Sequence, residues 1–287
     1  MTVIIGWVTV VVCTLGGYAA MGGKLYVLWQ PFEVVIIVGS ALGAFVAANP
    51  GHVSKHAMGA FMDQLKGKKS YDAGAYIELL TLLCAVFKTA KSKGFLALEP
   101  HIENPHESTL FQAYPGFMKD HHAVEFLCDY LRMISMGTEN PHELADLIDE
   151  ELEIHHNEHH TLGGAIQTMA DGMPALGIVA AVLGVIKTMG SINEPPEVLG
   201  KLIGGALVGT FLGVWVSYGF LAPVASAMNQ RFDAEGKYFL VMRAAMIAYL
   251  QGYAPQVCVE FGRKALGSDV RPSFMEVEEA TADVQAA

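Results

Sequence analysis

Four histidines near the middle of the chain have the spacing of metal ligands on a helix. His155, His156, His159 and His160 form two pairs four residues apart, and such a pair of imidazoles can hold a zinc ion on one helix face. The run lacks the HExxH order of zinc proteases, and no nucleophile, base and orienting group accompany it. A solvated polar helix end is the favoured interpretation, so we expect no metal, no cofactor and no enzymatic activity.

A second set of distinctive residues lies inside apolar segments. Pro174 and Pro223 each leave a backbone carbonyl without its helical donor, and Thr210 and Ser217 supply hydroxyl groups. Both prolines fall near the predicted inner ends of their helices, so we expect them at similar depth. Such groups can border an ion path, or they can simply kink a helix and bond back to its own backbone.

The apolar segments lack an ionisable residue in their middle. Glu33 and Asp171 fall at predicted segment edges, and no Asp, Glu, Lys, Arg or His lies near a segment midpoint. An ion pathway through a membrane normally uses such a group. If this chain serves proton or sodium flow, the titrating carboxylate must therefore come from another subunit with a transmembrane helix.

Composition indicates that the bilayer is the solvent of these segments. Hydrophobic residues make up 52% of the 287 positions and charged residues only 16%, which is too apolar for an ordinary soluble domain. We predict an all-α integral membrane protein with four transmembrane helices and a helical cytoplasmic domain. The net charge of -11 argues against nucleic acid as a partner.

Four apolar blocks set the predicted order of segments. The segments are a first membrane helix (1–21), a short outer loop (22–30), a second membrane helix (31–49), a helical cytoplasmic domain (50–168), a third membrane helix (169–189), a second short outer loop (190–200), a fourth membrane helix (201–228), and a cytoplasmic C-terminal helix with an acidic tail (229–287). The first block lacks a basic start and a clean cleavage site, so we interpret it as a retained helix.

The distribution of basic residues predicts the orientation. Of 18 Lys and Arg residues, nine lie in segment 50–168 and six in segment 229–287. Four of them follow the second helix closely, where the positive-inside bias counts most: Lys55, Lys66, Lys68 and Lys69. Both long segments and both termini are therefore predicted to be cytoplasmic.

The polar segments also carry local signals. Tyr76 to Lys93 has helical apolar spacing and predicts an amphipathic helix. The tetrapeptide Asn-Pro-His-Glu occurs at Asn104–Glu107 and at Asn140–Glu143, and each copy predicts a helix start with Asn as N-cap. The tail from Glu276 to Ala287 is predicted to be disordered.

Small residues and cysteines complete the pattern. Glycines four residues apart, Gly39 and Gly43 and then Gly205, Gly209 and Gly213, favour close packing of helix backbones. The cysteines show no CxxC spacing, so we interpret them as buried thiols rather than a disulfide or zinc framework: Cys13, Cys84, Cys128 and Cys258.

Five motifs spread over nearly the whole chain carry a family resemblance. They are QPFEVVII (30–37), IENP (102–105), PALGIVAA (174–181), VGTFLG (208–213) and VEFGRK (259–264). Together they resemble the MotA family of flagellar motor stator proteins, of the MotA/TolQ/ExbB proton channel family. The resemblance implies a multi-pass protein of the bacterial inner membrane with periplasmic outer loops. It also implies a homo-oligomeric ring, a pentamer, around a MotB dimer whose single membrane helix supplies the aspartate.

The resemblance assigns roles to individual residues. Pro174, Pro223 and Thr210 match the family's ion-pathway positions. Ala181 stands where sodium-type relatives have threonine, which favours protons because sodium needs oxygen ligands as it sheds water.

A rotor contact is implied as well. Lys91 and Glu99 match the charged positions that engage the rotor switch protein FliG. Lys91 replaces the family's usual arginine and loses its bidentate fork, so Lys88 and Lys93 are added as neighbouring contacts. The alternatives are an ExbB- or TolQ-like stator that energises outer-membrane transport, a sodium-driven motor stator and a passive scaffold. The first is disfavoured by the extra N-terminal helix and the motif at 30–33.

Overall fold

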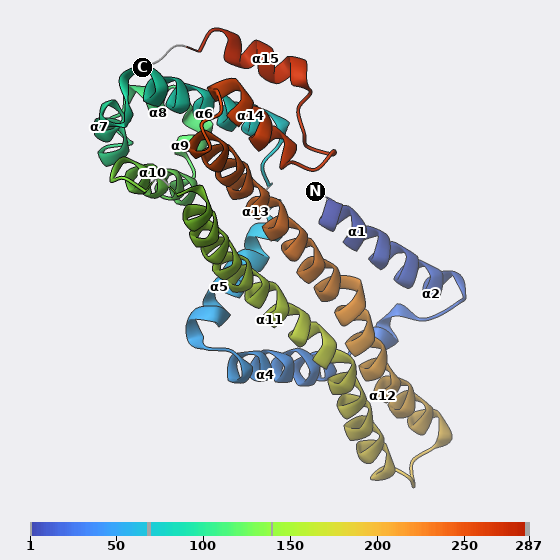
Figure 1. Cartoon of the computed structure of the whole chain (residues 1–287). Coiled ribbons are helices and arrows are strands. Elements are labelled where there is room, and N and C mark those ends of the chain that lie inside the picture. Colours follow the sequence, from blue (N-terminus) through green and yellow to red (C-terminus); the bar gives the residue numbers. More distant parts are fainter. Residues whose placement is uncertain (1, 68–69, 139, 285–287) are drawn as a thin grey trace. The chain divides into compact units, whose positions relative to one another are not determined.

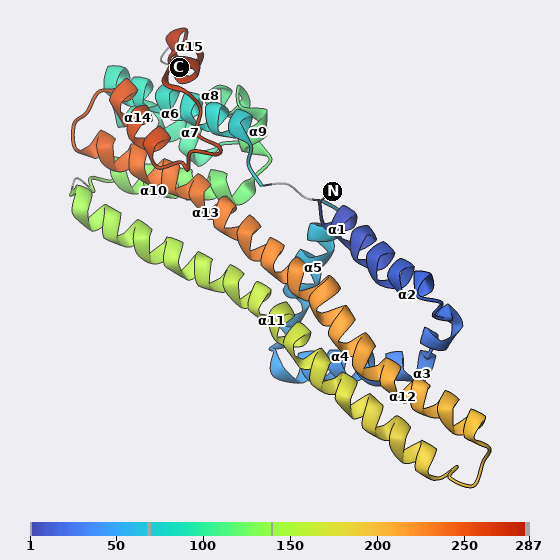
Figure 2. The ribbon, with the colours of Figure 1, turned by 90° about the vertical axis from the view of Figure 1, so that its right-hand side faces the viewer.

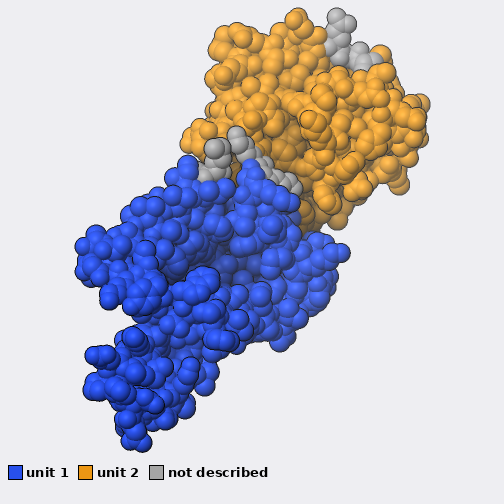
Figure 3. Space-filling view, turned by 180° about the vertical axis from the view of Figure 1, so that it is seen from behind, with its two compact units in different colours: residues 1–68, 158–230 blue, residues 69–157, 231–287 orange. Residues whose placement is uncertain are grey.

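The computed structural model of the chain describes residues 2–67, 70–138 and 140–284 (Figure 1). Lys68 and Lys69, two of the four lysines used to predict orientation, lie outside these ranges, as do residues 285–287 of the acidic tail. The chain divides into two compact units, coloured separately in Figure 3: unit 1 comprises residues 1–68 and 158–230, and unit 2 comprises residues 69–157 and 231–287. Within the described ranges every regular element is a helix.

Unit 1 contains the predicted membrane segments. Its elements are α1 (Thr2–Val11), the π-helix η1 (Val12–Gly16), α2 (Gly17–Ala20), the 3-10 helix η2 (Leu25–Leu28), α3 (Pro31–Val34), the π-helix η3 (Val35–Gly39), α4 (Ser40–Ala48), α5 (Gly51–Leu65), the C-terminal part of α11 (Pro141–Met189), α12 (Pro196–Val216), the π-helix η5 (Ser217–Leu221) and the N-terminal part of α13 (Ala222–Leu250). Proline opens α3, α11 and α12, where its missing N–H costs no helical hydrogen bond.

The first helix displays its apolar side chains instead of burying them. Ile5 and Val12 are each 62% exposed, which is the surface expected of a helix solvated by lipid tails. Two of its contacts with the rest of unit 1 involve tryptophan side chains. Trp7 packs on Phe220 with ring centroids 5.4 Å apart, and the Trp215 indole N–H donates to the Thr14 hydroxyl at 3.2 Å.

Unit 2 is a helical domain with its own apolar core. Its elements are α6 (Ala73–Lys93), the 3-10 helix η4 (Phe95–Ala97), α7 (Glu99–Glu103), α8 (Thr109–Gln112), α9 (Pro115–Met118), α10 (His121–Ser135), the N-terminal part of α11, the C-terminal part of α13, α14 (Pro255–Lys264) and α15 (Phe274–Ala282).

The helix at the centre of this core is α6. The sequence predicted an amphipathic helix here, and the structure shows a helix that is buried on nearly all faces. Leu79, Leu82 and Val86 are as fully buried as Leu83 and Phe87, which belong to the predicted stripe. The helix is therefore enclosed on nearly all sides, since α14, α15 and the short helices α8 and α9 all pack against it. The stripe prediction was wrong because it left out apolar residues on the other faces.

Five helical stretches of the described chain are long and apolar enough to cross a membrane. They are Val3–Ala20, Leu25–Ala48, Ala73–Lys93, Pro141–Met189 and Pro196–Leu250. The third of them is α6, and 61% of its apolar window is buried inside the chain, against 0% and 17% for the two N-terminal stretches. Since a lipid-facing helix must expose apolar surface, burial separates α6 from the others.

The two copies of Asn-Pro-His-Glu have different structures. At Asn140 the prediction of an N-cap is confirmed: its side-chain oxygen accepts from the His142 N–H at 3.0 Å, and α11 begins at the next residue. Glu143 accepts from the Asn140 side-chain amide at 2.8 Å instead of reaching the backbone. At Asn104 the prediction was wrong, because this copy forms a turn and the following helix is capped by Ser108.

The predicted disorder of the tail was wrong for most of its length. Residues Phe274–Ala282 form α15, and Ser273 and Glu276 close a capping box at its start. Val277 and Thr281 are buried against the unit 2 core. The reading of the cysteines as buried thiols was also wrong for Cys13, which is exposed, and is confirmed for the other three.

Candidate functional site

The candidate ion pathway lies along an antiparallel pair of helices, α11 and α12. These helices pack closely because glycine residues stand at their contact. A side chain on Gly213 would place its Cβ 2.7 Å from the Met173 carbonyl oxygen and 2.8 Å from the Gly177 Cα. Nearer the connecting loop, a Cβ on Gly184 would lie 2.6 Å from the Ala206 Cβ. The two backbones are in direct contact, and Figures 1 and 2 both show the helices running side by side.

The predicted glycine packing is therefore confirmed for the fourth helix only. Gly205, Gly209 and Gly213 all have close neighbours, whereas a Cβ on Gly39 or Gly43 would meet nothing within 4 Å in the described chain. The second helix leaves its small residues on an open surface.

The register of this helix pair places two of the predicted pathway residues close together. A Cβ on Gly209 would lie 3.0 Å from the Ala180 Cβ and 3.1 Å from the Ala181 backbone N. Thr210 is the next residue of α12, so its partly exposed hydroxyl lies at the level of Ala181, which is also partly exposed. Ala181 and Thr210, which are 29 positions apart in sequence, thus lie at the same level of the helix pair.

The two prolines do not lie at the same depth, contrary to the prediction. The contacts Gly184–Ala206 and Gly177–Gly213 fix an antiparallel register, and continuing it places Pro174 near Val216. Pro223 follows about seven residues later, or roughly 10 Å along the helix axis. Pro174 is partly buried and Pro223 exposed. The prediction placed each proline by its distance from a segment end, which ignored the unequal lengths of the two helices.

A π-helix, η5, lies shortly before Pro223, and the sequence analysis did not predict it. The five residues of η5 interrupt the helix before Pro223, whose ring nitrogen has no hydrogen to donate. Ser217 begins this segment, and its hydroxyl oxygen is buried without a hydrogen-bond partner. π-helices are frequent at functional sites, and the serine and glycine before Pro223 were the available signal.

Glu33, which is predicted to lie at a membrane edge, packs its carboxylate against α12. A Cβ on Gly209 would lie 2.8 Å from the Glu33 Oε2, and Gly209 is the fourteenth residue of α12. The carboxylate therefore lies at the level of Thr210 and Ala180. The preceding helix η2 also packs against α12.

An apolar cavity lies beside the pathway but cannot carry ions. It has a volume of about 220 Å³ and is lined only by apolar side chains: Val38, Leu42, Met58, Phe61, Ile166, Met169, Met173, Val216 and Leu221. Water in a cavity needs two to four polar partners. This cavity therefore excludes the hydrated path that proton transfer requires.

The residues assigned to the rotor contact lie at one end of the unit 2 core. Lys91 and Glu99 are both exposed and flank the turn that follows α6. Gly94 ends α6 with φ +80, a left-handed conformation that strains any other residue. The following Phe95 packs edge-on against the Tyr249 ring at 5.6 Å. The turn is anchored in the core while the two charges face outward.

Lys88 occupies a different environment from Lys91. Its ammonium group donates to the backbone carbonyls of Thr281 at 3.2 Å and Val284 at 2.7 Å. The Thr281 carbonyl lies in the last turn of α15 and the Val284 carbonyl just beyond it, where a cation interacts favourably with the helix dipole. Lys88 therefore holds the C-terminal helix against α6. Lys93 is exposed on the last turn of α6.

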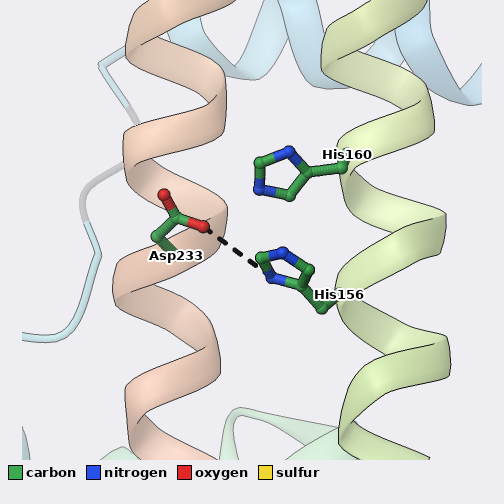
Figure 4. Close-up of side chains that lie close together, drawn as sticks. All are labelled: His156, His160 and Asp233. Carbon is green, nitrogen blue, oxygen red and sulfur yellow. Dashed lines mark ion pairs between the residues drawn. The ribbon is translucent and has the colours of Figure 1, made fainter.

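Two residues of the histidine run, His155 and His156, have contacts within unit 2. The His156 Nδ1 lies 3.8 Å from the Asp233 Oδ1, the ion pair drawn as a dashed line in Figure 4. His160 follows one turn later on the same helix, and His155 packs against the Phe239 ring at 5.4 Å. The absence of a metal here remains a prediction.

Comparison with known proteins places this geometry among channel subunits. Residues 4–94 match the family described as Motility protein A N-terminal, and residues 119–239 match the MotA/TolQ/ExbB proton channel family. The chain is 40% identical to Motility protein A of Escherichia coli over 279 residues, which cover 97% of this chain and 94% of the relative. It is 38% identical to Chemotaxis protein LafT of Vibrio parahaemolyticus over 280 residues, with 97% and 98% covered.

Solved structures have the same fold. A structure described as C. jejuni MotAB superposes with a TM-score of 0.78 at 20% identity, covering 95% of this chain and 98% of that one. The flagellar MotAB stator complex from Bacillus subtilis gives a TM-score of 0.72 at 25% identity, with 90% and 92% covered.

Proposed function

The chain belongs to the MotA/TolQ/ExbB proton channel family, among the motility protein A proteins, and on this premise we propose that it is a stator subunit of the bacterial flagellar motor. Together with a MotB-type partner it forms a proton channel that converts ion flow into torque on the rotor. The observation that carries the proposal is the identity of 40% over 97% of the chain to a motility protein A. It is not an enzyme in this account.

The membrane arrangement supports this function. We assign the four spans to residues 1–21, 31–49, 169–189 and 201–228. The fifth apolar helix, α6, is left out because its surface is buried in unit 2. The excess of Lys and Arg in segments 50–168 and 229–287 supports cytoplasmic termini in the inner membrane.

The ion pathway uses a carboxylate supplied by the partner. Protonation of the partner's membrane aspartate neutralises it and lets it move along a path that Thr210, Pro174 and Pro223 border at successive levels. The buried, unpartnered hydroxyl of Ser217 supports such a path, because a buried polar group without a partner is costly until a donor or acceptor arrives. A proton that crosses 100 mV releases about 2.3 kcal/mol, which biases a step between states a few kcal/mol apart.

Ala181 supports the choice of protons over sodium. Its backbone N lies 3.1 Å from the position of a Cβ on Gly209, the neighbour of Thr210, and its methyl group adds no oxygen ligand to the Thr210 hydroxyl. Sodium would need several oxygen ligands to replace its hydration shell, whereas a proton needs only water and a carboxylate.

Force reaches the rotor through the exposed charges of unit 2. Five copies would surround the partner dimer, and each would present Lys91 and Glu99 on its anchored turn to the rotor switch protein FliG. Lys93 adds charge at the end of α6, and Lys88 contributes by keeping α15 in place.

Co-purification and complementation test the proposal. The chain and a one-helix MotB-type partner are co-expressed in a strain that lacks both stator subunits, and swimming speed is measured as sodium is replaced by potassium. The proposal predicts a co-purifying complex and swimming that persists without sodium. Failure to assemble with any MotB-type partner would contradict the function, and collapse of swimming in potassium would contradict the choice of ion.

A further inference from the structure

Glu33 places an unused carboxylate inside the candidate pathway. Its Oε2 is buried and has no hydrogen-bond partner, and it lies against Gly209, the residue before Thr210. Pro31 begins the short helix that carries it, and Gln30 fits against Gly205 one turn away, with its amide nitrogen 3.1 Å from the position of an added Cβ. The QPFE motif thus docks on the glycine stripe of α12.

The close fit depends on glycine at positions 205 and 209 of α12, where no side chain stands between the helix backbone and the QPFE motif. A Cβ at position 209 would overlap the carboxylate at 2.8 Å, and one at position 205 would crowd the Gln30 amide. Two polar side chains therefore approach a helix backbone at a depth where lipid-facing residues are apolar. Mere packing would not require a carboxylate here.

An ionised carboxylate is expensive in this environment. Charge buried in a medium of low dielectric costs several kcal/mol unless a partner compensates it. The titratable side chains nearest to this contact along the surrounding elements are Tyr26 on η2, Glu197 and Lys201 on α12, and Asp171 and Lys187 on α11, and all five are exposed. None of them neutralises the buried Oε2, so the carboxyl group is stable here only while it holds a proton or meets a donor.

We propose that Glu33 is a proton relay on the outer side of the pathway, a role that rests on the proposed function. A proton from the periplasmic water adds to the Glu33 carboxylate. The resulting acid transfers that proton to the ionised carboxylate of the partner helix, which becomes neutral, and Glu33 returns to the anion. The next proton from outside restores it, so charge and protons balance over the cycle.

Proton flux through the reconstituted complex tests this role. The chain and its MotB-type partner are placed together in liposomes with a potassium gradient and valinomycin, and internal pH is followed with a dye. Glu33→Gln keeps the shape and cannot titrate, and Glu33→Asp keeps the acid. Glu197→Gln is the matched control, because it removes an exposed carboxylate from the helix against which Glu33 packs.

The variants have distinct expected outcomes. Glu33→Gln lowers proton flux by about 10²-fold, the lower end of what a positioned proton-transfer group contributes. Glu33→Asp restores a large part of the flux, and Glu197→Gln conducts normally. Co-purification with the partner stays unchanged for all three variants.

Two results would overturn the relay. One is wild-type flux in Glu33→Gln, and the other is an assembled Glu33→Asp that is as inactive as Glu33→Gln, since the carboxylate would then serve only to position other groups. Either result leaves the stator function standing, because wild-type flux is measured in the same preparation. A wild-type complex that passes no protons would instead refute the proposed function.

Discussion

Replacing one glycine in the contact between α11 and α12 should separate these helices measurably. The perturbation is Gly213→Ala. Its new methyl group would lie 2.7 Å from the Met173 carbonyl oxygen and 2.8 Å from the Gly177 Cα. Both are backbone atoms, so no side chain can rotate away to make room. Non-bonded heavy atoms are comfortable at about 3.5–4.0 Å, so α12 must move outward by about 1 Å.

The magnitude follows from comparison with a matched glycine on the same helix. Gly204 faces open space, where an added Cβ meets nothing within 4 Å. Both substitutions gain about 1 kcal/mol of helix propensity, so the difference between them isolates the steric cost. Overpacking of a well-packed contact costs about 1–3 kcal/mol, and we expect Gly213→Ala to be less stable than Gly204→Ala by that amount.

Unfolding in mixed micelles measures this difference. The purified chain is titrated with sodium dodecyl sulfate in a mild detergent, and helicity is followed by far-UV circular dichroism. Gly213→Ala should unfold at a lower fraction of dodecyl sulfate than Gly204→Ala, which should match or exceed the unmodified chain. Equal stability of the two variants would refute the direct backbone contact and the register built on it.

Three further predictions concern unit 2. The double change Lys91→Glu and Glu99→Lys should lower swimming torque without loss of assembly, because exposed ion contacts contribute about 1 kcal/mol or less each; unchanged torque in a tethered-cell assay would count against this surface. Asn140→Ala should cost about 1 kcal/mol in thermal unfolding and Asn104→Ala almost nothing, since only Asn140 caps a helix; equal losses would contradict the cap assignment. Burial raises the pKa of the Cys258 thiol to about 11, so its thiolate is scarce below that pH and it should resist a thiol reagent at neutral pH; rapid labelling of the folded protein would show that unit 2 is open there.

The sequence predicted the all-helical architecture because apolar block length and glycine spacing are local properties. The stripe of Gly205, Gly209 and Gly213 indicated close packing, and the structure shows it. The partner of the stripe was not predictable, since the register of α11 on α12 depends on contacts between distant residues. The depth error for Pro174 and Pro223 has the same cause.

Other errors arose because one local sequence signal was weighed without a second signal nearby that favours a different structure. The second copy of Asn-Pro-His-Glu starts a helix, whereas the first yields to Ser108, which caps α8 four residues after Asn104. The capping box of Ser273 and Glu276 was present in the sequence but was outweighed by the acidic composition of the tail. The contact of Glu33 with α12 was not predictable from a local signal, because it depends on the packing of η2 and α3 against α12.

The central claim is that this chain forms a proton channel only together with an acid carried by its partner. Proton flux into liposomes tests it directly when the chain alone, the complex, and the complex with the partner's membrane aspartate changed to asparagine are compared at equal protein density. We predict flux for the unmodified complex only. Full flux through the chain alone, or through the complex with asparagine, would contradict the account.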